Sequence, residues 1–369
     1  MTIKKFYRCK NCLMVSTRPR TNFVRGVCSA CINFAERKKI NWKQREKTLW
    51  NLCNKIRKKN GDHDIIVPVG GGKDSSYVAW VLKHKFKMNP LCVFCEPPMF
   101  TELGQENLNN FEKAGFDVLR ISQNEHYRKM EKICFTESGL PQNNWLALIT
   151  VAPMRIAKNL KIKMIMWGED GESMYGGNNS QKNKISPRAD YFFKTKVNNN
   201  SLSKYIKKNN LDKKNYFWSN IEDNEIKQFS SILKCHWSYF EKWDEEKHLK
   251  LAKKFCGHKN LKKKQQASLN DHSHTDQRLY SLHMYLAYLK FGFGRATTDV
   301  SIGIRHKKYS KKQGIQLINK NDSIFPTEFL NDYLNYFKIN KSQFFKILKK
   351  FVNKDLFKIN KKKIVFRYK

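Results

Sequence analysis

Short apolar runs alternate with amphipathic stretches over the first half of the chain. The apolar runs are rich in β-branched residues and predict buried strands at 62–69, 90–98, 117–122 and 161–170. Apolar residues recur at helical spacing in 42–60, 76–86, 101–116, 126–139 and 144–160. Because strands that alternate with helices form parallel pairs, the pattern predicts an α/β fold with a doubly wound parallel sheet.

The pattern changes from about residue 191 onward. Aromatic-rich helical patterns occupy 236–255, 276–294 and 327–351, with no clear strand between them, and the polar stretch 196–215 is typical of a surface loop. The sequence therefore predicts three parts: a cysteine-rich segment at 1–40, the sheet domain at 41–190, and a mainly helical C-terminal region at 191–369.

Composition limits the partners that the chain can have. Its formal net charge is +40, but the lysines are spread along all 369 residues and few arginines alternate with aromatic residues. This distribution does not favour a dedicated nucleic-acid surface and suits small anionic substrates such as nucleotides equally well. No apolar run of about 18 residues is present and the N-terminus lacks a signal core, so we expect a cytoplasmic protein without a membrane span.

Four of the ten cysteines fall into two CxxC pairs near the N-terminus. Two such pairs supply four thiolates for a closed tetrahedral site, which predicts a structural Zn2+ ion rather than a catalytic one. A short segment with few apolar residues gains its folding energy from such a metal. The predicted ligands are Cys9, Cys12, Cys28 and Cys31.

A second motif, GGGKDSS, lies between the first predicted strand and the helix that follows it. Glycines let the backbone approach phosphate oxygens, and the unpaired N–H groups of a helix N-terminus attract anions. Hydroxyl groups can add hydrogen bonds in the first helical turn, and a carboxylate there can cap the helix or hold Mg2+. The motif predicts a phosphate site formed by Gly70, Gly71, Gly72, Lys73, Asp74, Ser75 and Ser76.

This motif closely resembles the SGGKDS loop of the PP-loop ATP pyrophosphatases, although Gly70 stands where that family has a serine. Those enzymes cleave ATP between the α and β phosphates, adenylate an oxygen of a substrate and let nitrogen or sulfur displace AMP. The resemblance implies ATP and Mg2+ as cofactors, with the pyrophosphate held at 70–76. It also implies that the adenine lies near the end of the second strand, around Phe94.

The family divides by nucleophile, and the cysteines keep a sulfur branch open. Enzymes that thiolate tRNA combine a PP-loop with zinc knuckles and further cysteines, for which Cys92, Cys95 and Cys134 are candidates. Cys92 and Cys95 lie in a buried strand, however, where the two-residue period points them to opposite faces. Buried cysteines also act simply as small apolar residues.

A longer resemblance favours the nitrogen branch. The segments 97–122, 167–177 and 288–315 together resemble the N-acetyl sugar amidotransferases, and the similarity runs from about residue 5 to 320. That family belongs to bacterial surface-glycan pathways, including pseudaminic and legionaminic acid, lipopolysaccharide O-antigen and flagellin glycosylation. The resemblance implies an ATP-dependent conversion of the acetamido group of a nucleotide-activated sugar to acetamidino, with ammonia as the nucleophile.

No glutaminase signature accompanies this activity in the chain. Residue 2 is threonine, and Cys256 lies in a lysine-rich helical segment without flanking glycines. The resemblance therefore implies partner subunits, a glutaminase that supplies ammonia and a cyclase-like protein.

Further residues are assigned roles by position. Gly168 and Glu169 lie at the carboxyl end of the fourth predicted strand and are expected near the phosphate site, with Glu169 binding Mg2+ or guiding ammonia and Asp170 as its alternative. We therefore expect Lys73, Asp74 and Glu169 to serve in catalysis. Arg295 is a candidate for a sugar-nucleotide phosphate. His272 and His274, in a polar loop, are expected to face solvent.

Two alternatives to the amidotransferase remain open. The first is a tRNA-thiolating PP-loop enzyme, which the charge and the three additional cysteines would suit. The second is a zinc-knuckle RNA-binding protein with an inactive nucleotide fold, for which Gly70 in place of serine is the argument.

Overall fold

A computed structural model gives the structure of the protein and describes residues 5–168, 176, 184–196, 201–360 and 363–368. Its centre is a five-stranded sheet in which every pair of neighbouring strands is parallel. The strand order is β5-β4-β3-β6-β7. The strands are β3 (Ile65–Val69), β4 (Pro90–Cys95), β5 (Asp117–Ile121), β6 (Met164–Trp167) and β7 (Leu233–His236). The predicted α/β fold with a parallel sheet is confirmed.

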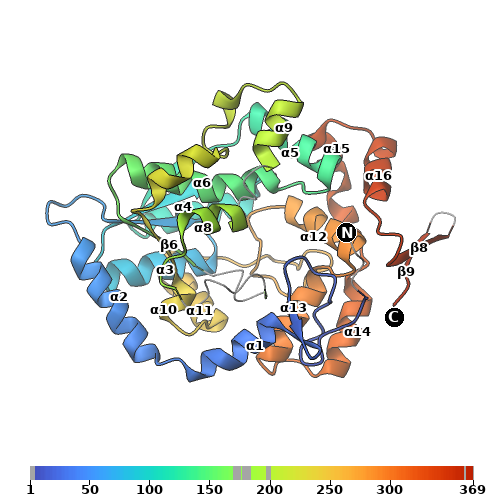
Figure 1. Ribbon diagram of the computed structural model, residues 1–369, viewed down its shortest axis with the longest axis horizontal. Coiled ribbons are helices and arrows are strands. Elements are labelled where there is room, and N and C mark those ends of the chain that lie inside the picture. Colours follow the sequence, from blue (N-terminus) through green and yellow to red (C-terminus); the bar gives the residue numbers. More distant parts are fainter. Residues whose placement is uncertain (1–4, 169–175, 177–183, 197–200, 361–362, 369) are drawn as a thin grey trace.

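Helices cover both faces of this sheet (Figure 1). One face packs against α5 (Glu125–Ser138), α6 (Asn143–Asn159), α8 (Ala189–Lys196) and α9 (Ser201–Lys208). The other packs against α2 (Trp42–Ile56), α3 (Lys73–His84), α4 (Glu102–Lys113), α10 (Trp237–Phe240) and α11 (Glu245–Cys256). Each face carries its own apolar core because alternate strand residues point to opposite sides.

Two expectations about the second half are wrong. A strand was not expected after residue 191, yet β7 extends the sheet by pairing with β6 in the register Met164↔Leu233 to Trp167↔His236. The sequence LKCH is short and mixes polar with apolar residues, so its pattern is too weak to indicate a strand. The stretch expected to be a loop also contains α9, a strongly amphipathic helix.

The C-terminal region is mainly helical, as predicted. It comprises α12 (Leu279–Phe291), α13 (Arg295–Arg305), α14 (Lys311–Asn321), α15 (Leu330–Phe337), α16 (Lys341–Lys350) and the hairpin of β8 (Phe357–Asn360) and β9 (Lys363–Phe366). Phe135 of α5 stacks on Phe337 of α15 at 4.6 Å, which joins this region to the sheet domain. The boundary at residue 190 stays a prediction, although β6 and β7 pair across it.

The N-terminal segment forms a small unit of β1 (Phe23–Val24), β2 (Val27–Cys28) and α1 (Ser29–Glu36). It lies beside α13 and α14 (Figure 1), with Leu13 packed among Val300 and Ile318. The short 3-10 helices are η1 (Arg37–Lys39), η2 (Lys213–Tyr216), η3 (Asp223–Phe229) and η4 (Thr327–Phe329). Within the described ranges, none of the helices has both the length and the apolar character that crossing a membrane requires.

Candidate nucleotide site

The glycine turn follows β3 at the point where the strand order reverses. The chain moves from β3 outward to β5 and then returns to β6 on the other side of β3. Ligands of open α/β sheets bind at such a switch point, outside the carboxyl ends of the strands. The predicted phosphate loop therefore occupies the position where this fold binds ligands.

Gly71 is the residue for which this turn requires glycine. Its φ is +71°, and a β-carbon there would lie 2.9 Å from the backbone nitrogen of Leu108 in α4. Both the backbone conformation and the contact with α4 exclude a side chain. Gly72 follows as the N-cap of α3, and nothing lies within 4 Å of the position that a β-carbon would take on it.

His258 fixes the peptide between these two glycines. Its Nδ1 lies 3.2 Å from the carbonyl oxygen of Gly71, and since a carbonyl only accepts, Nδ1 must donate. The C=O and N–H of a trans peptide point in opposite directions, so the N–H of Gly72 is directed away from His258. Within the described chain this N–H has no acceptor. It remains available to an anion.

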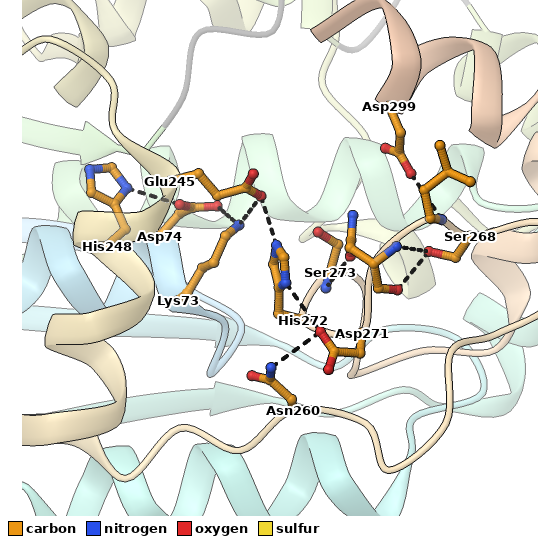
Figure 2. Close-up of polar contacts among 12 residues, drawn as sticks. Lys73, Asp74, Glu245, His248, Asn260, Ser268, Asp271, His272, Ser273 and Asp299 are labelled. Atoms are coloured by element: carbon orange, nitrogen blue, oxygen red, sulfur yellow. Dashed lines mark hydrogen bonds and ion pairs between the residues drawn. The ribbon is translucent and has the colours of Figure 1, made fainter. Parts of the chain in front are cut away.

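Lys73 and Asp74 open α3 and lie in the middle of an ion-pair network (Figure 2). Lys73 Nζ lies 2.8 Å from Asp74 Oδ2 and 3.3 Å from Glu245 Oε1. Asp74 Oδ1 lies 2.9 Å from Nδ1 of the fully buried His248. Burial would raise the pKa of Asp74, but Lys73 and His248 outweigh it and lower the pKa.

The network continues from α11 into the loop before α12. Glu245 Oε1 also lies 3.1 Å from His272 Nε2, and His272 Nδ1 lies 3.3 Å from Asp271 Oδ1 (Figure 2). Burial raises the pKa of Glu245, but His272 and Lys73 hold it well below the usual range. The expectation that His272 faces solvent is wrong. One of its two partners, Glu245, comes from α11, which no local sequence pattern brings next to this loop.

The remaining residues predicted for this site differ in what they contact. Ser75 Oγ donates to the Gly72 carbonyl and accepts from the Gly70 N–H, so it braces the turn itself. Ser76 is buried. Phe94 is buried in the core beside Phe100, with ring centroids 5.3 Å apart. Gly168 at the end of β6 lies against Asp74, and Glu169 and Asp170 lie outside the described residues.

Arg295, the predicted phosphate contact, occupies a neighbouring corner at the start of α13. Its guanidinium forms two contacts of 3.0 Å with Asp299 and donates to the Tyr280 hydroxyl at 3.2 Å. His274 stacks on the Tyr280 ring at 3.5 Å, so it is not the solvent-facing residue that we expected. Together they line a small cavity of about 20 Å³, room for one water-sized molecule.

The four N-terminal cysteines meet in one cluster, as predicted. Their sulfurs all lie within 4.8 Å of one another, with Cys9 and Cys31 3.9 Å apart and Cys12 and Cys28 3.5 Å apart. Four sulfurs bound tetrahedrally to zinc at about 2.3 Å are about 3.8 Å apart. The cluster fits zinc and could also hold an iron–sulfur cluster; the ion itself stays a prediction.

The cysteines of the alternative hypothesis do not assemble. Cys92 lies in the core on one face of the sheet, whereas Cys95 and Cys134 lie in the core on the other. Burial raises the pKa of Cys95 and Cys256 to about 12, which keeps both as thiols. Among the described residues, the N-terminal cluster is the one group in which three or more Cys, His, Asp or Glu side chains lie close enough to hold a metal ion by themselves.

Several residues of the site were not found from the sequence. His248, Glu245 and His258 come from α11 and its end, a lysine-rich amphipathic stretch whose pattern predicts only a helix. Asp276 was also missed, although its Oδ2 lies 3.6 Å from the position that a β-carbon would take on Gly70. The one available signal was the density of His and Asp in DHSHTD, next to an aromatic helix.

Comparison with known proteins adds a family likeness for the C-terminal region. Residues 253–369 match the family described as LPS biosynthesis protein WbpG-like, C-terminal domain. An uncharacterized protein of Methanocaldococcus jannaschii is 26% identical over 163 residues, which make up 39% of this chain and 58% of that protein. The chain thus spans less than two thirds of that relative's length.

Two solved structures are similar at a low level. The U34-tRNA thiolase NcsA from Methanococcus maripaludis with its 4Fe–4S cluster has 12% identity and a TM-score of 0.31, over 84% of this chain and 88% of that chain. The NH3-dependent NAD synthetase from Campylobacter jejuni has 15% identity and a TM-score of 0.29, over 59% and 94%. Likenesses of this degree do not define the activity of this chain.

Proposed function

We propose that the protein is an ATP-using enzyme of bacterial surface-glycan biosynthesis that converts a sugar acetamido group to acetamidino. The geometry of the glycine turn carries this proposal, because Gly71 and His258 leave the Gly72 N–H available beside Lys73. Donors preorganised in this way stabilise a polyphosphate as charge develops on it. The likeness of residues 253–369 to a WbpG-like LPS biosynthesis domain supports the glycan pathway.

The proposed reaction has two steps. The acetamido oxygen attacks the α-phosphorus of ATP, the bond to the β-phosphate breaks, and pyrophosphate leaves. Ammonia then adds to the imidate carbon and gives up one proton to solvent, and AMP departs with the former acetamido oxygen, which leaves a protonated acetamidino group. Neither step needs a protein nucleophile, so the chain's task is to orient reactants and to balance charge.

Different residues of the site would bind the pyrophosphate, neutralise its charge and position the lysine. The Gly72 amide and the N-terminus of α3 would bind the pyrophosphate oxygens, and the Lys73 ammonium would neutralise part of their charge. Asp74 and Glu245 hold Lys73 in place from two sides. Mg2+, when bound with ATP, supplies further neutralisation of the leaving pyrophosphate. Glu169 and Arg295 keep their predicted roles as proposals.

Partner subunits belong to the same proposal. Both Cys256 and the threonine at position 2 argue against an internal glutaminase, since a buried thiol with a raised pKa is a poor nucleophile. A separate glutaminase and a cyclase-like subunit would then supply ammonia. The separation of Cys92 from Cys95 and Cys134 weakens the tRNA-thiolating alternative.

Pyrophosphate release tests the proposal. The protein is incubated with ATP, Mg2+ and ammonium chloride, and CMP- and UDP-linked acetamido sugars are compared with bulk tRNA. We expect release with one class of sugar, and a sugar product lighter by about one mass unit because O is replaced by NH. Asp74→Ala should abolish both signals. Release with tRNA and a sulfur donor alone would overturn the proposal in favour of thiolation.

A further inference from the structure

The backbone around Asp276 is fixed at the carboxyl end of β4. Asp276 accepts a hydrogen bond from the Thr101 N–H at 3.0 Å through its carbonyl oxygen, and the Thr101 hydroxyl donates to the Thr275 carbonyl at 2.6 Å. The Asp276 α-carbon stands only 2.7 Å from the position that a β-carbon would take on Gly104. The loop before α12 is therefore clamped against α4, with little freedom to move Asp276.

This clamp places the Asp276 carboxylate beside the glycine turn. Its Oδ2 is 3.6 Å from the position that a β-carbon would take on Gly70, so the carboxylate lies within van der Waals distance of the turn. The residue is half-buried, and burial raises the pKa of its carboxyl to about 6. In the described chain no lysine, arginine or histidine pairs with it, although the protein carries 72 lysines and arginines.

An unpaired carboxylate at this position conflicts with the binding of a polyphosphate. Two negative groups that share one partly desolvated site repel each other unless a cation lies between them. Mg2+ meets this need, because it is commonly held by one or two carboxylates together with substrate phosphates. The nearby Asp74 is less suited, since Oδ1 contacts His248 at 2.9 Å and Oδ2 contacts Lys73 at 2.8 Å.

We infer that Asp276 is a ligand of the divalent cation that bridges the protein to a polyphosphate bound at 70–72. The inference rests on the proposed function, because it requires that the glycine turn binds ATP. It assigns the two carboxylates different tasks. Asp74 orients Lys73, and Asp276 binds the metal.

Calorimetry with α,β-methylene ATP, which cannot be cleaved between the α and β phosphates, separates the contributions. The native protein should bind the analogue more tightly in Mg2+ than in EDTA. In Asp276→Asn we expect most of that gain to disappear, about tenfold or more in Kd. In EDTA the same variant should bind as tightly as the native protein or more tightly, because the repulsion is removed. A purely structural role would weaken binding in both buffers.

Two controls keep the result interpretable. Asp355→Asn removes the same charge from an exposed position and should leave both affinities unchanged, which excludes an effect of net charge. Removal of an unpaired, half-buried carboxylate should not destabilise the fold, and thermal unfolding of Asp276→Asn and Asp276→Ser checks this.

On the native protein, Mn2+ with the analogue should give an anomalous scattering peak within bonding distance of Asp276.

Other results would contradict either the role of Asp276 as a metal ligand or the proposed function itself. If Asp276→Asn keeps the full gain from Mg2+ but turns over slowly, Asp276 acts on a proton and not on the metal. A Mn2+ peak on the analogue without Asp276 in contact would also show that Asp276 is not a ligand of the metal. If the native protein binds the analogue in neither buffer, the proposed function itself is wrong, and the cation site with it.

Discussion

His258 Nδ1 donates a hydrogen bond to the carbonyl oxygen of Gly71 across 3.2 Å. His258 follows Gly257, the left-handed residue that ends α11, and Asn107 of α4 holds the next residue through Lys259 N–H at 2.7 Å. Contacts from α4 and from the end of α11 therefore fix the conformation of the turn after β3. This arrangement explains how a loop with three successive glycines keeps one conformation.

Replacing His258 tests whether it positions the peptide. Asparagine places an amide N–H close to where Nδ1 stands, so His258→Asn should retain the affinity for α,β-methylene ATP. His258→Phe fills similar space without a donor and should weaken binding by about tenfold, as the loss of one hydrogen bond of about 1 kcal/mol and of loop order predicts. Equal loss of binding in both variants would contradict the positioning role.

Gly71→Ala should be more damaging than an ordinary glycine substitution. The positive φ costs roughly 1–2 kcal/mol for any other residue, and the contact with Leu108 at 2.9 Å adds a clash with a helix backbone. Gly61 provides a matched control, because its φ is +83° but nothing lies within 4 Å of its β-carbon position. Urea denaturation should show a clearly larger loss in the free energy of unfolding for Gly71→Ala than for Gly61→Ala. Similar losses would mean that α4 shifts enough to accommodate the β-carbon.

Acid should destabilise the protein partly through His258. Burial, opposed by the bond to Gly71, lowers the pKa of His258 from 6.5 to about 4. The unfolded chain therefore binds the proton more readily, and the stability that the neutral ring contributes is lost as the pH falls below 6.5 towards 4. Between pH 7.5 and 5 the loss from this group is about 2 kcal/mol.

His258→Asn isolates that contribution, because asparagine does not titrate. Its free energy of unfolding should decrease by about 2 kcal/mol less than that of the native protein over the same pH range. Parallel pH profiles for the two proteins would show that His258 is not held neutral by the fold.

The four-cysteine cluster should bind one metal that supports more than its own segment. Leu13 lies next to a ligand, Cys12, and packs against Val300 and Ile318 of the C-terminal helices. Cys12→Ser should therefore lose the metal and lower the thermal midpoint, whereas Cys256→Ser, another buried cysteine, should keep the metal. Elemental analysis should find zinc; a brown protein with iron and sulfide would contradict the predicted ion.

The sheet could be predicted because its central strands are buried on both sides. Runs such as IIVPV and LCVFC are apolar throughout, and β3 and β4 form from them, within the predicted ranges 62–69 and 90–98 but shorter than these ranges. β7 lies at an edge and reads LKCH, so its pairing with β6 rather than its own pattern makes it a strand. Local sequence carries no information about that pairing.

The same limit applies to the site. The GGGKDSS motif is contiguous, and its backbone requirements are visible in the glycines themselves. His248, His258 and Asp276 reach it from segments more than 170 residues away, as the separations of 174 and 187 for the first two contacts show. Only the packing of α11 on α3 and of the loop before α12 on α4 brings them there.

The most direct test of the account follows the acetamido oxygen. A nucleotide-linked acetamido sugar labelled with ¹⁸O in its carbonyl is incubated with ATP, Mg2+, ammonium chloride and the protein, and the AMP is examined by mass spectrometry. If the oxygen is adenylated and then displaced by ammonia, the label must appear in AMP in the same amount as the acetamidino product. Product with unlabelled AMP, or labelled sugar that never reacts while ATP is cleaved, would contradict the mechanism.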